Sequence, residues 1–182
     1  MRMAIALLLL LAVSIPVFAA PSPAPDPVLA SLAALSGPAF DLAYMRALIP
    51  VHEEAVEMAL AATLNADHAE LLKWNQRVVE RKNTQVRQML VWLREAGASP
   101  GQRYAGVATP AVKKLRGLKG AALERSYIPM MAGQLERSVA LSRLAAAKAH
   151  RQEVRAMAGE IARVEAQEVT MLRGWLRKWY PG

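Results

Sequence analysis

Apolar residues recur at helical spacing along most of the chain after residue 26. Within residues 68–95 the apolar positions lie three, four or seven residues apart, which places them on one face of an α-helix. They are Leu71, Val78, Val79, Val86, Met89 and Leu93. The same pattern elsewhere predicts long helices over about residues 40–64, 68–95, 123–148 and 151–179, and short apolar turns at 28–35 and 111–118.

A second pattern is an internal repeat with a constant offset of 83 residues. Residues 27–94 align with residues 110–177 without a gap, and 15 of the 68 pairs are identical. The identical pairs include Gly37/Gly120, Tyr44/Tyr127 and Trp92/Trp175. A fixed period of this kind indicates duplicated supersecondary units. We predict repeat units at 27–95 and 110–179, joined by a linker at 96–109.

Each predicted unit is a helical hairpin that cannot bury its apolar face alone. Two such hairpins are expected to pack against each other as one all-α four-helix bundle that spans residues 27–182.

The N-terminus is typical of an export signal. Arg2 precedes an apolar stretch at residues 4–15, and Val17-Phe18-Ala19 places small residues at the positions that a signal peptidase reads. This predicts a signal peptide at residues 1–19, cleaved after Ala19, and a flexible Pro-rich linker at 20–26. An uncleaved membrane anchor is the alternative, but the run is short for a span of about 20 residues. The mature protein is therefore expected to be periplasmic or secreted, with no stable membrane span.

Composition and charge narrow the possible functions. The chain has no cysteine, which excludes disulfides and thiolate metal sites. Its formal net charge is +8. The basic residues are interspersed with Glu at helical spacing, as on solvated helix faces, so we expect no nucleic-acid partner. The sequence leaves a protein partner and the oligomeric state open.

Polar residues interrupt the apolar faces at matched positions of the two units. Lys82 and Gln85 in the first unit correspond to Glu165 and Glu168 in the second. Two carboxylates three residues apart inside a bundle can begin a carboxylate-bridged metal site. The alternative is an internal ion pair between Lys82 and Glu165, with Gln85 and Glu168 hydrogen-bonded nearby. The sequence favours the ion pair, because an ammonium at the metal position would repel a cation.

One histidine and several methionines are further candidate ligands. His52 borders the inner face of the helix at 40–64, and thioethers together with histidine can bind Cu(I). The alternatives are a hydrogen-bonded core histidine and methionines that only fill the core. The chain contains no Glu-x-x-His pattern, no Gly-rich phosphate loop and no plausible nucleophile set. We therefore do not expect an enzyme.

The first unit also resembles a known family. Phe40-Asp41-x-x-Tyr44-Met45-x-x-Leu48-Ile49-Pro50-Val51-His52-Glu53-x-Ala55-Val56 resembles the opening motif of the exported, ferritin-like domain-of-unknown-function family 305. The resemblance extends over about residues 32–176. It implies export and a ferritin-like four-helix bundle. Some family members are linked to copper binding and copper tolerance through paired His and Met residues.

The chain departs from the family pattern at several of those paired positions. Val51 stands where the family has the first His of its pair, and Leu48 stands where it has a Met. In the second unit the His pair is replaced by Gln134-Leu135. The remaining candidate metal ligands are His52, Met58, Met89, Glu165 and Glu168.

The sequence thus predicts an exported helical bundle that binds a transition metal, copper, in metal homeostasis or tolerance. The alternative is a structural or protein-interaction module without a metal, in which an internal ion pair replaces the ancestral site.

Overall fold

The computed structural model describes residues 26–181 and contains six helices and no strands in that range. The four long helices are α2 (Gly37–Thr63), α3 (Ala69–Glu95), α5 (Gly120–Lys148) and α6 (Gln152–Trp179). Two short helices, α1 (Pro27–Ala33) and α4 (Pro110–Arg116), precede α2 and α5. The predicted signal peptide and residues 20–25 of the predicted linker lie outside the described residues.

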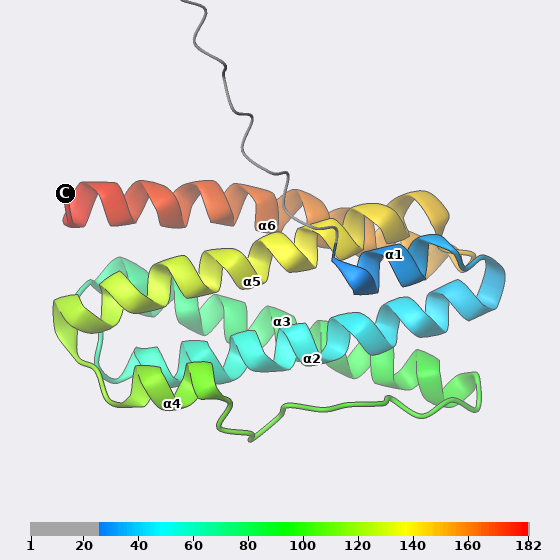
Figure 1. The fold of residues 1–182 in the computed structure, drawn as a ribbon, viewed down its shortest axis with the longest axis horizontal. Coiled ribbons are helices and arrows are strands. Elements are labelled where there is room, and N and C mark those ends of the chain that lie inside the picture. The colour runs from blue at the N-terminus through cyan, green and yellow to red at the C-terminus, as the bar shows by residue number, and fades with distance from the viewer. Residues whose placement is uncertain (1–25, 182) are drawn as a thin grey trace, which may run out of the picture.

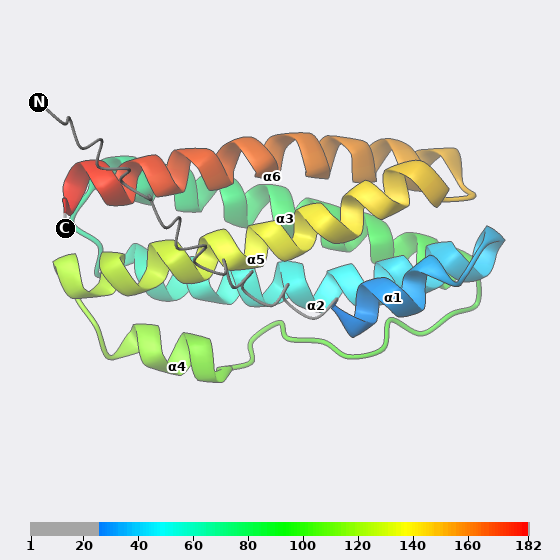
Figure 2. The ribbon, with the colours of Figure 1, turned by 45° about the horizontal axis from the view of Figure 1, so that its top comes forward.

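The long helices form a four-helix bundle, which confirms the predicted fold class. Helices α2 and α3 form one antiparallel hairpin and α5 and α6 the other, and the hairpins pack with α2 against α5 (Figure 1). Helix α1 lies against α2 and α5, and α4 covers the far end of α2 (Figure 2). None of the helices in residues 26–181 has the length and apolar character that a membrane crossing requires.

The helices α2 and α5 begin three residues earlier than the sequence pattern predicts. Each begins at a glycine with positive φ, +59° at Gly37 and +53° at Gly120. The space at Gly120 is also restricted, because a Cβ atom there would lie 2.7 Å from Oδ2 of Asp67. Glycine therefore allows the backbone conformation at both positions, and at Gly120 it also allows the close approach of the preceding hairpin turn.

Each hairpin stabilises the start of the other hairpin's second helix. Asp41 of α2 accepts hydrogen bonds from the backbone N–H groups of His150 and Arg151, both at 2.8 Å, just before α6. Glu124 of α5 does the same for Asp67 and His68 before α3, at 2.7 and 2.8 Å. Asp41 and Glu124 are partners in the 83-residue repeat. A carboxylate at a helix N-terminus satisfies free N–H groups and complements the helix dipole.

The apolar core consists of two clusters at opposite ends of the bundle. One contains Phe40, Tyr44 and Met89, and the other contains Trp74 and Tyr127. Buried polar side chains from all four long helices are found in the same interior, including His52, Lys82, Ser138 and Glu165.

Candidate functional site

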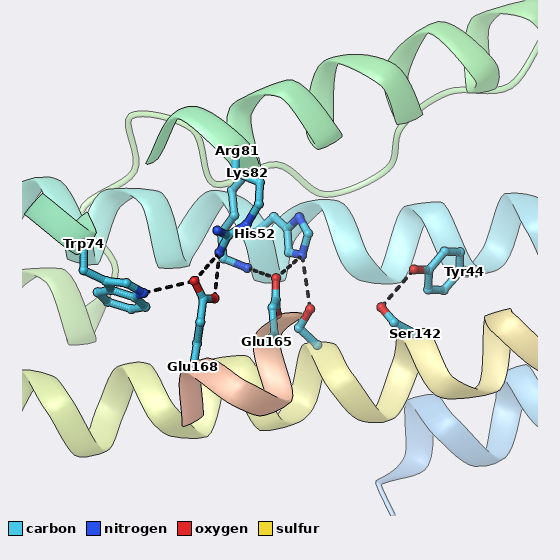
Figure 3. A network of polar contacts seen from close by, with 9 residues as sticks. Tyr44, His52, Trp74, Arg81, Lys82, Ser142, Glu165 and Glu168 are labelled. Atoms are coloured by element: carbon cyan, nitrogen blue, oxygen red, sulfur yellow. Dashed lines mark hydrogen bonds and ion pairs between the residues drawn. The ribbon is translucent and has the colours of Figure 1, made fainter. Parts of the chain in front are cut away.

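A buried ion pair joins α3 to α6 in the interior of the bundle. Lys82 Nζ lies 2.5 Å from Glu165 Oε1, and both residues are 0% exposed. Figure 3 shows the two side chains pointing toward each other from their helices. The predicted Lys82–Glu165 ion pair is therefore confirmed. Burial lowers the pKa of Lys82, although the adjacent Glu165 carboxylate opposes that shift.

His52 of α2 completes this central cluster. Its Nε2 is hydrogen-bonded to Ser138 Oγ of α5 at 3.1 Å and lies 3.5 Å from Glu165 Oε1. Complete burial lowers the pKa of His52 well below 6.5, and the charges of Lys82 and Arg81 lower it further. His52 is therefore neutral at physiological pH, and its contact with Glu165 is not an ion pair.

Two polar atoms of this cluster have no hydrogen-bond partner among the described residues. They are Nδ1 of His52 and Oε2 of Glu165. A buried polar atom without a partner costs about 1–3 kcal/mol. Protein groups therefore supply hydrogen bonds to only part of the cluster, although the distance within its central ion pair is short and both residues are fully buried.

Glu168 belongs to a neighbouring cluster closer to the surface. Arg81 Nη2 donates to both carboxylate oxygens, at 2.8 and 2.6 Å, and Trp74 Nε1 donates to Oε1 at 3.0 Å. The sequence prediction that Gln85 and Glu168 are hydrogen-bonded nearby is confirmed for Glu168 but is wrong for Gln85, whose Oε1 has no partner within residues 26–181. Arg81 bonds to Glu168 instead: its Nη2 alone contacts both carboxylate oxygens, while its Nε has no partner among the described residues.

The structure brings together only part of the predicted ligand set. His52 and Glu165 are adjacent, and Glu168 lies one turn away, bound to Arg81. Met58 packs in the core cluster around Trp74, whereas Met89 packs in the opposite cluster around Phe40. In the part of the chain that the structure describes, no three His, Cys, Asp or Glu side chains form a group that could hold a metal ion.

The charges of the central cluster do not fit a metal cation. The Glu165 carboxylate already faces the Lys82 ammonium, and the Glu168 carboxylate faces the Arg81 guanidinium. A cation placed between them would meet two positive groups within a few ångströms, in an interior where charges are weakly screened. The arrangement can hold helices together, and each of the two carboxylates is already paired with a positively charged side chain.

Several residues of these clusters were not predicted as site residues. Arg81 and Trp74 are seven residues apart, so they share a face of α3, and that spacing is a signal that could have identified them. Ser138 has no such signal, because its repeat partner is Ala55.

Two further polar contacts link the hairpins: Tyr44 to Ser142 at 3.0 Å, and Tyr127 to Asn75 at 2.6 Å.

Known proteins with this fold include metal-bound structures. CopM in its Cu(I)-bound form has a TM-score of 0.69 and 20% identity, and the match covers 77% of this chain and 97% of CopM. CopM in the apo form has a TM-score of 0.64 and 21% identity, over 77% and 98% of the two chains. A protein from Streptomyces coelicolor described as a secreted DUF305 protein has a TM-score of 0.69 and 19% identity, over 76% and 91%.

At these identities the structural matches establish the fold alone. Comparison with curated proteins finds no match to this sequence. The sequence itself matches the family described as Domain of unknown function (DUF305) over residues 19–93 and 124–181, which is most of the chain and includes parts of both repeat units. The protein therefore belongs to the DUF305 family.

Proposed function

We propose that this protein is an exported, non-catalytic helical bundle of the cell envelope that carries no metal at its centre. The observation that supports this is the fully buried contact of 2.5 Å between Lys82 Nζ and Glu165 Oε1. The ammonium supplies the positive charge that a carboxylate at this position needs. Export is supported by the predicted signal peptide and by the structural similarity to a protein described as secreted.

In this proposal the protein acts through its surface, as a structural or interaction module. The buried carboxylates are neutralised by Lys82 and Arg81, and His52 is hydrogen-bonded to Ser138. The charge of each buried carboxylate is thus balanced by a cation of the protein itself. The central cluster then fixes the positions of α2, α3, α5 and α6 relative to one another.

Metal analysis of the tag-free mature protein, residues 20–182, tests this proposal. Elemental analysis by inductively coupled plasma mass spectrometry should find no stoichiometric metal. Competition titrations should show no uptake of Cu(I), Ag(I) or Cu(II) at the central cluster. The variant Lys82→Gln removes the ammonium and releases the Glu165 carboxylate, so it should take up a cation more readily than the wild type. Stoichiometric metal in the wild type that is lost in His52→Ala would refute the proposal.

Copper binding is the second candidate function. It is favoured by the structures of CopM with Cu(I), Cu(II) and Ag bound, which share this fold. The candidate ligands are His52, Met58, Met89, Glu165 and Glu168.

Of these ligands, Met58 is almost fully buried, at 1% exposure, but it reaches the surface at one pocket. It borders a surface pocket of about 340 Å³ together with Met130, which adds a second thioether. If a soft cation binds there, Met58→Leu should reduce Ag(I) uptake, whereas Met89→Leu, which changes the opposite core cluster, should leave it unchanged. Equal uptake by both variants and the wild type would exclude this site.

A further inference from the structure

A surface pocket lies at the end of the bundle where α3 ends and α6 begins. Its volume is about 490 Å³, within the range of small-molecule sites. Leu42, Met45, Trp92 and Val154 form its apolar walls, and Asp41 lies at its polar side. Asp41 is only 5% exposed and uses one hydrogen bond on each carboxylate oxygen, so each oxygen can still accept another.

The sequence repeat relates this pocket to the opposite end of the bundle. The 83-residue offset matches Trp92 to Trp175 and Asp41 to Glu124, and it matches Ala96 to Trp179. The pocket residues therefore have counterparts in the other half, which allows the contents of the two spaces to be compared directly.

Aromatic side chains fill the equivalent space at the opposite end. Trp179 stacks on His68 with ring centroids 3.9 Å apart, and on Trp175 at 5.1 Å. Tyr180 donates its hydroxyl hydrogen bond to Glu124 Oε2 at 2.7 Å. The half that contains α6 thus supplies its own aromatic rings and its own donor to the capping carboxylate.

The first half has no such side chains. Ala96 stands at the position of Trp179, and Gly97 stands at the position of Tyr180. Trp92 packs in the core at 8% exposure, and the charged group over its ring is the Arg151 guanidinium, 5.2 Å from the ring centroid. The aromatic wall and the acceptor are retained, while the groups that would occupy the space between them are missing.

We propose that this pocket binds a planar aromatic group that carries a hydrogen-bond donor, of the indole or phenol class. The ring lies beside Trp92, as Trp179 lies against Trp175, and it contacts the Arg151 guanidinium, which lies over Trp92 and is paired with Glu95. The donor reaches Asp41, as the hydroxyl of Tyr180 reaches Glu124. This site is separate from the central cluster, and it does not depend on whether the protein binds metal.

The test is a titration of the mature protein, residues 20–182, followed by amide and indole chemical shifts in NMR spectra. The probes are indole, phenol and a short peptide that ends in Trp-Tyr. Shifts are expected at Trp92, Met45 and the start of α6. Binding of indole or phenol identifies a free aromatic molecule as the ligand type, and binding of the peptide alone identifies an aromatic side chain. Cyclohexanol, which has a donor but no aromatic ring, should bind at least tenfold more weakly.

Filling the pocket provides the decisive variant. Ala96 is exposed, and Ala96→Trp places an indole where the other half has Trp179, so it should abolish binding. Gln88→Trp, on the exposed side of α3, is the matched control and should bind as the wild type does. Ala96→Leu fills less of the space and should weaken binding by a smaller factor, which covers the case in which the larger variant does not fold.

Two results would overturn the proposal. One is the absence of shifts at the pocket residues with all three aromatic probes up to their solubility limits. The other is unchanged binding in a folded Ala96→Trp variant, since the probe would then occupy another part of the surface.

Discussion

Removing one partner of the central ion pair should destabilise the protein far more than removing both. At 2.5 Å and an effective dielectric constant of 20, Coulomb attraction between Lys82 and Glu165 is about 7 kcal/mol. Burying the two ions costs several kcal/mol each, so the net contribution of the pair is close to zero. After Lys82→Met the Glu165 carboxylate remains buried without its ammonium partner, and we expect a loss of about 3–5 kcal/mol. Glu165→Leu should cost a similar amount, because it leaves a buried ammonium.

The double variant Lys82→Met/Glu165→Leu should recover most of this loss. It removes both charges and also the unpartnered Oε2 of Glu165, so its free energy of unfolding should lie within about 1 kcal/mol of the wild type or above it. Urea unfolding of residues 20–182, followed by far-ultraviolet circular dichroism, measures the wild type, the two single variants and the double variant as one double-mutant cycle.

An exposed pair in the same helix is the control. Glu160 and Arg163 of α6 are also in contact, with an Nη2–Oε1 distance of 2.7 Å, but their side chains are 58% and 59% exposed. Alanine at either position should leave the unfolding curve unchanged. Additive losses in the central cycle, or single variants that cost less than about 1 kcal/mol, would contradict the description of Lys82 and Glu165 as a buried, mutually dependent pair.

Four further predictions concern the helix cap at Asp41, the titration of Glu124 and of His52, and the N-terminus of the exported protein. Asp41→Ala leaves two backbone N–H groups before α6 without their acceptor, and urea unfolding should show a loss of about 2 kcal/mol. Burial opposes ionisation of Glu124, yet hydrogen bonds from His68, Tyr180 and Asp67 lower its pKa below 4.5. The free energy of unfolding should therefore fall as the pH drops below 4.5. In Glu124→Gln this decrease should be smaller. The pKa of His52 is lowered in the folded state, so on acidification the unfolded chain takes up a proton first. The free energy of unfolding should therefore decrease below pH 6.5. His52→Leu should make this dependence on pH less steep, and an unchanged dependence would contradict the argument. Mass spectrometry of the exported protein should show an N-terminus at Ala20, and an intact signal segment would contradict the predicted cleavage.

The fold could be predicted well from the sequence because two independent patterns agree. The helical spacing of apolar residues located the four long helices to within three residues, and the repeat indicated how the hairpins pair. The boundaries at Gly37 and Gly120 were missed because a glycine with positive φ can begin a helix before the first apolar position. The spacing of side chains gives no information about backbone conformation at such a residue.

The central cluster could be predicted only in part. Lys82 and Glu165 were identified because the repeat places them at one height on two equivalent helices. The partner of Glu168 was missed because Arg81 lies beside the apolar stripe and reaches the carboxylate with a long side chain. Met58 and Met89 were candidates by residue type, but residue type does not reveal that they pack in different core clusters.

The position of Lys82 and Glu165 in the repeat explains why this pair depends on a duplicated chain. The two residues are exact counterparts in the 83-residue repeat, and they meet each other across α3 and α6. Two identical hairpins related by twofold symmetry would bring like side chains together here: two carboxylates would then need a bound cation, and two ammonium groups would need an anion. Once both hairpins belong to one chain, the two positions can carry opposite charges and neutralise each other. The two halves have diverged in the same way at Ala96 and Trp179, which leaves a pocket at one end of the bundle and an aromatic stack at the other. The asymmetry between the halves therefore accounts for both the central ion pair and the pocket.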